Sequence, residues 1–248
     1  MLELFPSQRM IYENYRSTRI EEPPHRQHKH VSFVYTPSAF RIPHSAFHLL
    51  FAICYLLFVI RQSVMLNDIR IIIHTAKGDL EATLIPADAP IATANFLNLA
   101  QRKFYDGLIF HRVVPAFVIQ GGDPAGTGRG DPGYRFENES RKSLSHETVG
   151  VLAMANAGPD TNGSQFYVTL AQLNPTHVKM LDDGYTIFGR LTKGIEIANQ
   201  IAQGDKISSV TILDPVEPLF QNQKERLQEW NKVLDRKFGS RIAPVTTT

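Results

Sequence analysis

The sequence predicts a mainly β protein, a closed antiparallel barrel of eight strands capped by two helices. Eight short apolar or β-branched segments, separated by turn residues, lie between residues 69 and 213. Two other segments, 90–101 and 194–203, repeat their apolar residues with a helical period. We expect the barrel to be closed because closure removes the exposed strand edges that an open sheet would have to protect.

Length and composition are those of an ordinary soluble globular protein. The chain has 248 residues, enough to bury a substantial core, with 43% hydrophobic and 20% charged residues. A formal net charge of +2 gives no reason to expect nucleic-acid binding. The single cysteine, Cys54, excludes an intrachain disulfide and a cysteine-rich zinc site.

Residues 1–64 are predicted to be a disordered tail that contains one apolar run at 46–60. This run is shorter than the roughly 20 residues needed to cross a bilayer. It is open to three interpretations: a short signal-anchor, a cleaved signal, or sequence upstream of a true translation start near Met65. The third is preferred and implies a cytoplasmic protein. The first would make the protein single-pass and membrane-anchored.

A hairpin and a helix are the first elements expected after residue 65. Strands at 69–75 and 80–84 flank a turn at 77–79. Asp88 and Pro90 then give an N-cap and first-turn signal for the amphipathic helix that ends near residue 101.

Further strands and a second helix complete the predicted barrel domain, which spans residues 65–214. A long surface loop is expected at 122–148, where Gly, Pro, Asp and Ser cluster. The second helix would run from Gly194 to Gln203 and stop at Gly204. The remaining strands are predicted near 108–113, 117–121, 150–155, 165–169, 187–191 and 208–213.

Residues 215–248 are predicted to form a C-terminal helix and tail. Asp214 to Glu217 reads as a capping-box-like helix start. We expect the apolar face of this helix to pack on the barrel rather than bind a partner. That face carries Phe220, Leu227, Trp230, Leu234 and Phe238.

One arginine lies among apolar residues in the stretch 110–124, FHRVVPAFVIQGGDP. A charge among hydrophobic neighbours is costly to hold unless something uses it, so Arg112 marks a candidate site. His111 alternates to the other face of the strand, where we expect a structural hydrogen bond. A second polar stretch follows, with MANAG at 154–158 and NGSQFY at 162–167.

In this order and spacing, the two stretches closely resemble the signature of the cyclophilin-type peptidyl-prolyl cis-trans isomerases, over roughly residues 68–214. The sequence looks like a bacterial-like member with a C-terminal helical extension. The resemblance implies a closed barrel capped by two helices, and an enzyme that accelerates X-Pro isomerisation during protein folding. The alternatives are a cyclophilin-fold module that binds proline peptides without turnover, and an envelope-anchored chaperone.

This chemistry has modest requirements. Rotation about an X-Pro bond faces a barrier of about 20 kcal/mol because the twisted amide loses its resonance. No bond breaks, so the catalyst needs no metal, nucleophile or cofactor and must only bind the twisted amide better than the planar forms. A fixed guanidinium suits this task because it can donate to the lone pair that the proline nitrogen regains. The expected partner is a proline-containing polypeptide, and the expected protein is a monomer.

The resemblance also assigns residues to roles. Arg112 would donate to the twisted amide, Phe117 would floor the proline pocket, and Gln120 would hold Arg112 and a peptide carbonyl. Asn156 would bind the extended substrate backbone, although it could instead satisfy a buried loop. The other substrate-binding residues would be Val118, Ala155, Ala157, Gln165, Tyr167, Met180, Leu181 and Tyr185.

Several positions depart from the family pattern. Val118 stands where many members have methionine, and Tyr167 where the second block ends in phenylalanine. Tyr185 replaces the histidine usual before the last strand of the motif. Many members also carry a tryptophan just before Leu-Asp, whose indole hydrogen-bonds the drug cyclosporin, and Met180 takes that position here. Phe166 is expected to belong to the barrel core.

Overall fold

The computed structural model describes residues 66–139 and 143–244. The predicted tail, its apolar run at 46–60 and the proposed start near Met65 lie outside these residues. Within the described ranges, no helix combines the length and the apolar character needed to cross a membrane.

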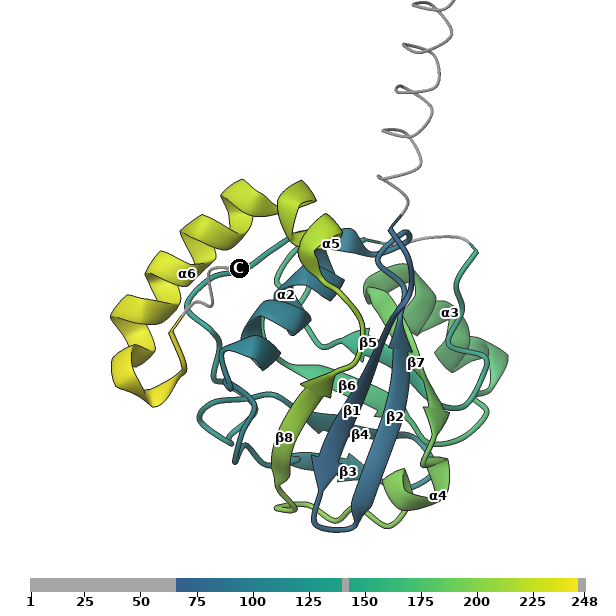
Figure 1. The fold of residues 1–248 in the computed structure, drawn as a ribbon. Coiled ribbons are helices and arrows are strands. Elements are labelled where there is room, and N and C mark those ends of the chain that lie inside the picture. The colour runs from purple at the N-terminus through teal and green to yellow at the C-terminus, as the bar shows by residue number, and fades with distance from the viewer. Residues whose placement is uncertain (1–65, 140–142, 245–248) are drawn as a thin grey trace, which may run out of the picture. The chain divides into compact units, whose positions relative to one another are not determined.

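Eight antiparallel strands form one curled sheet around a hydrophobic core (Figure 1). Their order across the sheet is β3-β4-β6-β5-β7-β2-β1-β8. Each strand overlaps a segment that the sequence predicts to be a strand. They are β1 (Ile69–Thr75), β2 (Gly78–Leu84), β3 (Arg112–Val114), β4 (Val118–Gly121), β5 (Val151–Met154), β6 (Phe166–Thr169), β7 (Ile187–Lys193) and β8 (Ile207–Ile212).

The barrel is open, so the prediction of a closed barrel is wrong in this respect. β3 and β8 are the two edges of the sheet. Residues just before β3 do reach the start of β8: the Phe110 N–H donates to the Asp205 carbonyl and the Ile207 N–H to the Leu108 carbonyl, each at 2.8 Å. β3 itself has three residues, too few to extend this contact into a ladder.

Side chains on β6 alternate between two buried faces of the sheet. Phe166 and Val168 belong to the main core inside the curl. Phe166 is fully buried and meets the ring of Phe96 edge to face at 5.3 Å, which confirms it as core. Tyr167 points the other way, into a second apolar cluster that also contains Val118. This outer cluster forms the base of the candidate site.

The first helix, α2 (Pro90–Gln101), packs against β7 and β8 and begins with a proline as predicted. Its N-cap is Ala89 rather than the predicted Asp88. The amides of its first turn instead donate to the carboxylate of Glu139, at 2.9 and 2.8 Å. A carboxylate from a distant loop therefore satisfies the start of the helix and complements its dipole.

The second predicted helix of the barrel domain is present but shorter than the sequence predicts. The expected helix at 194–203 is reduced to the short α4 (Ile195–Ala198). Beyond its end, in the turn that precedes β8, the Asp205 carboxylate accepts the Ala202 N–H at 2.8 Å. A longer helix, α3 (Pro175–Gly184), lies where the sequence predicts none.

The C-terminal segment folds as predicted into helix that packs on the core. It is split into α5 (Glu217–Asn222) and α6 (Lys224–Phe238), and a short 3-10 helix, η3 (Gly239–Arg241), follows. Figure 1 shows α6 alongside α2. The buried side chains of α6 are three of those expected: Leu227, Trp230 and Leu234.

Asp214 does not cap this segment as expected. Its carboxylate accepts three hydrogen bonds from Arg70, one from the backbone N–H at 2.8 Å and two from the guanidinium at 2.9 and 2.7 Å. These bonds lower the pKa of Asp214 to about 2 and tie the end of β8 to β1. The carboxylate is thus engaged by the neighbouring strand, and the N-cap of α5 is Val216.

Candidate active site

A pocket of about 190 Å³ lies around Arg112, over the outer apolar cluster, and is called the Arg112 pocket below. Strands β3, β4 and β6 and helix α3 all contribute to it. Every residue that lines it is one that the sequence predicts for the site. These residues are Arg112, Phe117, Val118, Gln120, Ala155, Asn156, Tyr167, Met180, Leu181 and Tyr185.

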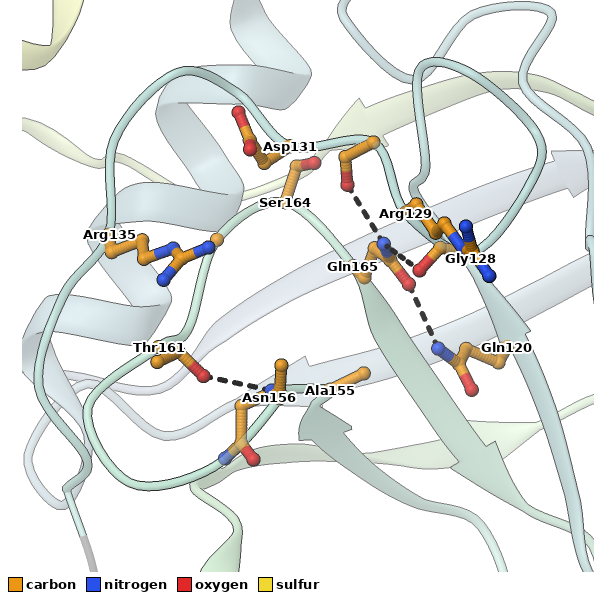
Figure 2. A pocket seen from close by; sticks show the side chains of 13 residues that line it. Gln120, Gly128, Arg129, Asp131, Arg135, Ala155, Asn156, Thr161, Ser164 and Gln165 are labelled. Carbon is orange, nitrogen blue, oxygen red and sulfur yellow. Dashed lines mark hydrogen bonds between the residues drawn. The ribbon is translucent and has the colours of Figure 1, made fainter.

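A second pocket, of about 330 Å³, shares Gln120, Ala155 and Asn156 with the first. It contains the two predicted residues that the Arg112 pocket lacks, Ala157 and Gln165, and is called the Gln165 pocket below (Figure 2). Its other lining residues are Gly128, Arg129, Gly130, Asp131, Arg135, Thr161, Gly163 and Ser164. The three shared residues make the two pockets direct neighbours.

Arg112 lies on β3 directly opposite Gln120 of β4. Its Nη1 donates to Gln120 Oε1 at 3.3 Å. In the described part of the chain, the guanidinium pairs with no carboxylate. The residue is exposed, so its charge and remaining N–H groups are available to a ligand.

A chain of hydrogen bonds fixes the amide of Gln120 (Figure 2). Gln120 Nε2 donates to Gln165 Oε1 at 2.9 Å. Gln165 Nε2 in turn donates to the carbonyls of Gly130 at 2.8 Å and Gly128 at 3.1 Å. Because an amide accepts on oxygen and donates on nitrogen, this chain turns the Gln120 oxygen toward Arg112. Sequence reasoning missed the chain because it depends on carbonyls of the irregular loop after β4.

The side chain of Asn156 braces a loop, the alternative that the sequence left open. Its Nδ2 donates to the Gly184 carbonyl at 2.9 Å, and its Oδ1 accepts the Gly158 N–H at 3.2 Å. The backbone N–H and C=O of Asn156 have no hydrogen-bond partner within the described residues. The main chain at this position is therefore free to pair with an extended peptide.

A buried histidine supports one wall of the Arg112 pocket. Tyr167 Oη lies 2.7 Å from His146 Nε2, and His146 Nδ1 lies 2.6 Å from Asp182 Oδ1. Burial lowers the pKa of His146 in spite of the nearby carboxylate. Partial burial would raise the pKa of Asp182, but hydrogen bonds from the backbone and ring of His146 lower it.

The protonation states of this trio follow from these directions. A neutral imidazole donates through Nδ1 to the ionised Asp182 and accepts the Tyr167 hydroxyl at Nε2. The ring of Tyr167 therefore lines the Arg112 pocket, while the Tyr167 hydroxyl is held by His146 behind that wall. No local sequence pattern indicates His146, because it reaches Asp182 of α3 across 36 residues of the chain.

The opening of the Arg112 pocket is formed by aromatic rings and an exposed thioether. The rings of Tyr167 and Tyr185 meet edge to face at 5.8 Å. Phe117 is half-buried, 5.5 Å from the ring of His177. Met180 is 54% exposed at the rim, whereas its neighbour Leu181 is buried.

His111, next to Arg112, does not make the structural hydrogen bond expected of it. Its side chain is buried, and neither ring nitrogen has a hydrogen-bond partner among the residues that the structure describes. The ring instead lies 3.6 Å from the position that a Cβ on Gly128 would occupy, so it packs against the loop after β4.

Comparison with known proteins agrees with this geometry. Residues 70–217 match the family model described as cyclophilin type peptidyl-prolyl cis-trans isomerase/CLD. The chain is 45% identical over 150 residues to peptidyl-prolyl cis-trans isomerase ppi1 of Schizosaccharomyces pombe, which covers 59% of this chain and 92% of that protein. It is also 45% identical over 153 residues to peptidyl-prolyl cis-trans isomerase-like 1 of mouse, covering 60% and 89%.

Solved structures give the same result. A crystal structure of a Cryptosporidium parvum cyclophilin-type isomerase matches with a TM-score of 0.55 and 34% identity, over 60% of this chain and 99% of that one. A second structure, obtained in the presence of the dipeptide Ala-Pro, matches with a TM-score of 0.54. The fold and the relatives thus define a peptidyl-prolyl cis-trans isomerase. The chain belongs to the cyclophilin-type family of these enzymes.

Proposed function

We propose that the enzyme acts on proline-containing polypeptides, and that Arg112 is the group that stabilises the twisted amide. The observation that carries the proposal is the placement of one guanidinium, held by Gln120, at the rim of a small pocket with apolar walls. The apolar pocket can hold the proline ring. The fixed donor can reach the nitrogen of the amide that precedes that ring.

The Arg112 pocket suits the proline ring. Phe117, Val118 and Leu181 offer apolar surface, and burial of apolar area contributes about 25 cal/mol per Å². Since the hydroxyl of Tyr167 is held by His146, this wall too presents mainly carbon to the ligand. A structure of the Cryptosporidium relative in the presence of Ala-Pro supports a proline peptide as the ligand class.

Arg112 would act on the transition state rather than on the bound ground state. The proline nitrogen of a planar amide is a poor acceptor, and it becomes a good one only when the bond twists. A single donor aimed at such a site is worth about 3 to 4 kcal/mol. No proton is transferred, because a guanidinium stays protonated and serves only as a hydrogen-bond donor.

The peptide on either side of the proline would be held by the main chain. The unpaired backbone groups of Asn156 can bond to an extended segment, as a neighbouring strand would. The shared lining of the two pockets then leads that segment toward Gln165. Positioning of this kind keeps the X-Pro bond aligned with Arg112 while it rotates.

NMR exchange spectroscopy on an Ala-Pro peptide, with the full chain added in catalytic amount, tests the proposal. We expect faster cis-trans exchange, together with shifted resonances at Phe117, Tyr167 and Asn156. Exchange that stays at the uncatalysed rate, or shifts confined to residues outside the Arg112 pocket, would overturn it.

A further inference from the structure

The C-terminal helix α6 lies beyond the part of the chain that matches the family model, which ends at residue 217. It nevertheless contacts residues 131–137 of the segment 128–137, and this whole segment is called the wall loop below. The wall loop forms one side of the Gln165 pocket, to which it contributes Gly128, Arg129, Gly130, Asp131 and Arg135.

Apolar packing holds the middle of the wall loop on α6. The ring of Trp230 stacks on Tyr134 with centroids 4.6 Å apart and planes 6° from parallel. The same indole lies 5.5 Å from the ring of Phe136 and is 5% exposed. Gly133 adopts a φ of +100°, and a Cβ there would fall 2.8 Å from Val233 of α6. A side chain at this glycine would therefore separate the loop from the helix.

Ion pairs flank this packed centre on both sides. Arg226 donates to both carboxylate oxygens of Glu137, at 2.9 and 2.7 Å. Lys237 donates to the carboxylate of Asp131 at 2.6 Å and to its carbonyl at 3.0 Å. One exposed pair contributes little by itself, but these two fix both ends of residues 131–137 to a single helix.

α6 is itself anchored to the barrel domain, so it can act as a fixed support. Arg102, at the end of α2, has a side chain only 3% exposed, and it pairs with Asp235 of α6. Its Nη1 also donates to Asn231 Oδ1 at 3.0 Å. The apolar side of α6 continues this contact with Leu227 and Leu234 in the main core.

The charge of the Gln165 pocket depends on the same helix. A hydrogen bond from Lys237 lowers the pKa of Asp131 and places a cation against that carboxylate. Arg129 and Arg135 lie on opposite sides of the pocket (Figure 2), and neither forms an ion pair in the described ranges. Lys237 and Arg135 both offset the negative charge of Asp131, and together with Arg129 they leave the pocket with a net positive charge.

We propose that α6 is a substrate-positioning element: it holds the wall loop so that the Gln165 pocket receives an acidic side chain of the polypeptide whose proline occupies the Arg112 pocket. This inference rests on the proposed function, since it needs the proline in that place. A bound chain can reach both pockets because they share Gln120, Ala155 and Asn156. Arg226, Trp230 and Lys237 act through the loop and are positioning residues, not catalytic ones.

The test uses the full chain and a series of Ala-Pro peptides in which one position at a time, on either side, is Glu, Ala or Lys. For wild type we expect the lowest KM with Glu at one position. Lys237→Ala should raise that KM about two- to fivefold, the range expected of an exposed charge pair, and leave kcat unchanged. Lys232→Ala is the matched control, because it removes the same charge from an exposed site on the same helix.

A second variant, Arg226→Ala with Lys237→Ala, frees both ends of the loop and leaves Trp230 in the core. Its melting transition checks that the variant is folded. We expect its KM for the Glu peptide to rise more than that of Lys237→Ala. Its KM for a bare Ala-Pro peptide should not rise. Equal KM values for Glu and Lys peptides in wild type, or equal effects of Lys232→Ala and Lys237→Ala, would overturn the inference. Peptide affinities from NMR titration compare the Glu and Lys peptides without any need for turnover. A protein that prefers the Glu peptide but does not catalyse exchange would therefore contradict the proposed function and not this inference.

Discussion

Arg112 Nη1 and Gln120 Oε1 lie 3.3 Å apart on directly opposed residues of β3 and β4. Gln120 is held in turn by Gln165, which bonds to carbonyls of the loop after β4. The orientation of the guanidinium is therefore linked to the carbonyls of Gly128 and Gly130, which precede the residues 131–137 that α6 contacts.

Replacement of Gln165 by alanine tests this link. It removes the acceptor that orients Gln120, and a neutral hydrogen bond typically contributes about 1 kcal/mol, so we expect kcat/KM to fall roughly fivefold. Arg112 and the proline pocket remain in place, so some activity should persist. Gln228→Ala, at an exposed position on α6, is the control. An unchanged kcat/KM in Gln165→Ala would show that the hydrogen-bond chain does not position Arg112.

Acid should destabilise the protein through His146. Its folded-state pKa lies below the ordinary value of 6.5 because the ring is buried, so the unfolded chain takes up the proton first as pH falls. The stability contributed by the neutral ring is complete above pH 6.5 and declines below that value until the folded-state pKa is reached.

Denaturant unfolding of wild type between pH 8 and pH 5 measures this decline, with the pH range chosen about the ordinary histidine pKa. His146→Gln should be less stable at neutral pH and should have a flatter pH profile. His177→Gln, at an exposed site, should keep the wild-type slope. If the free energy of unfolding of His146→Gln falls with pH as steeply as that of wild type, other groups cause the acid sensitivity.

Cyclosporin should inhibit weakly. By resemblance to the family, an indole donor binds the drug, and the exposed Met180 provides neither an N–H nor a flat ring at the rim of the Arg112 pocket. Met180→Trp should therefore strengthen inhibition, while Met180→Leu should leave it weak. Inhibition constants from a protease-coupled assay decide the matter, and nanomolar inhibition of wild type would contradict the role given to this position.

Local sequence patterns were sufficient for the sheet but not for every helix. The β-branched run of β1 and the turn after it predict a hairpin, because both signals act within a few residues. α3 has an N-cap at Asn174 and a proline in its first turn, yet Leu181 is its one buried residue. Val178 and Leu181 give it only a short apolar stripe, too brief to indicate a helix by period alone. The capping signal alone would have located it.

The site shows the same division between local and distant determinants. The motif residues converge because Arg112, Gln120 and Tyr167 lie on three successive strands of the sheet, β3, β4 and β6. Contacts that support them span much longer separations, such as His146 with Asp182. The pairing of Lys237 with Asp131 crosses 106 residues, and no single-sequence pattern encodes it.

The most direct measurement is kcat/KM for an Ala-Pro peptide in wild type and Arg112→Ala, together with the affinity of both proteins for that peptide. Loss of the transition-state donor should lower kcat/KM a hundredfold or more, from about 3 to 4 kcal/mol, whereas affinity should fall much less. Arg112→Lys should restore activity only in part, because an ammonium lacks the planar fork that also reaches Gln120. A melting transition like that of wild type confirms that the variant is folded. A folded Arg112→Ala protein with near-wild-type kcat/KM would contradict the role of Arg112.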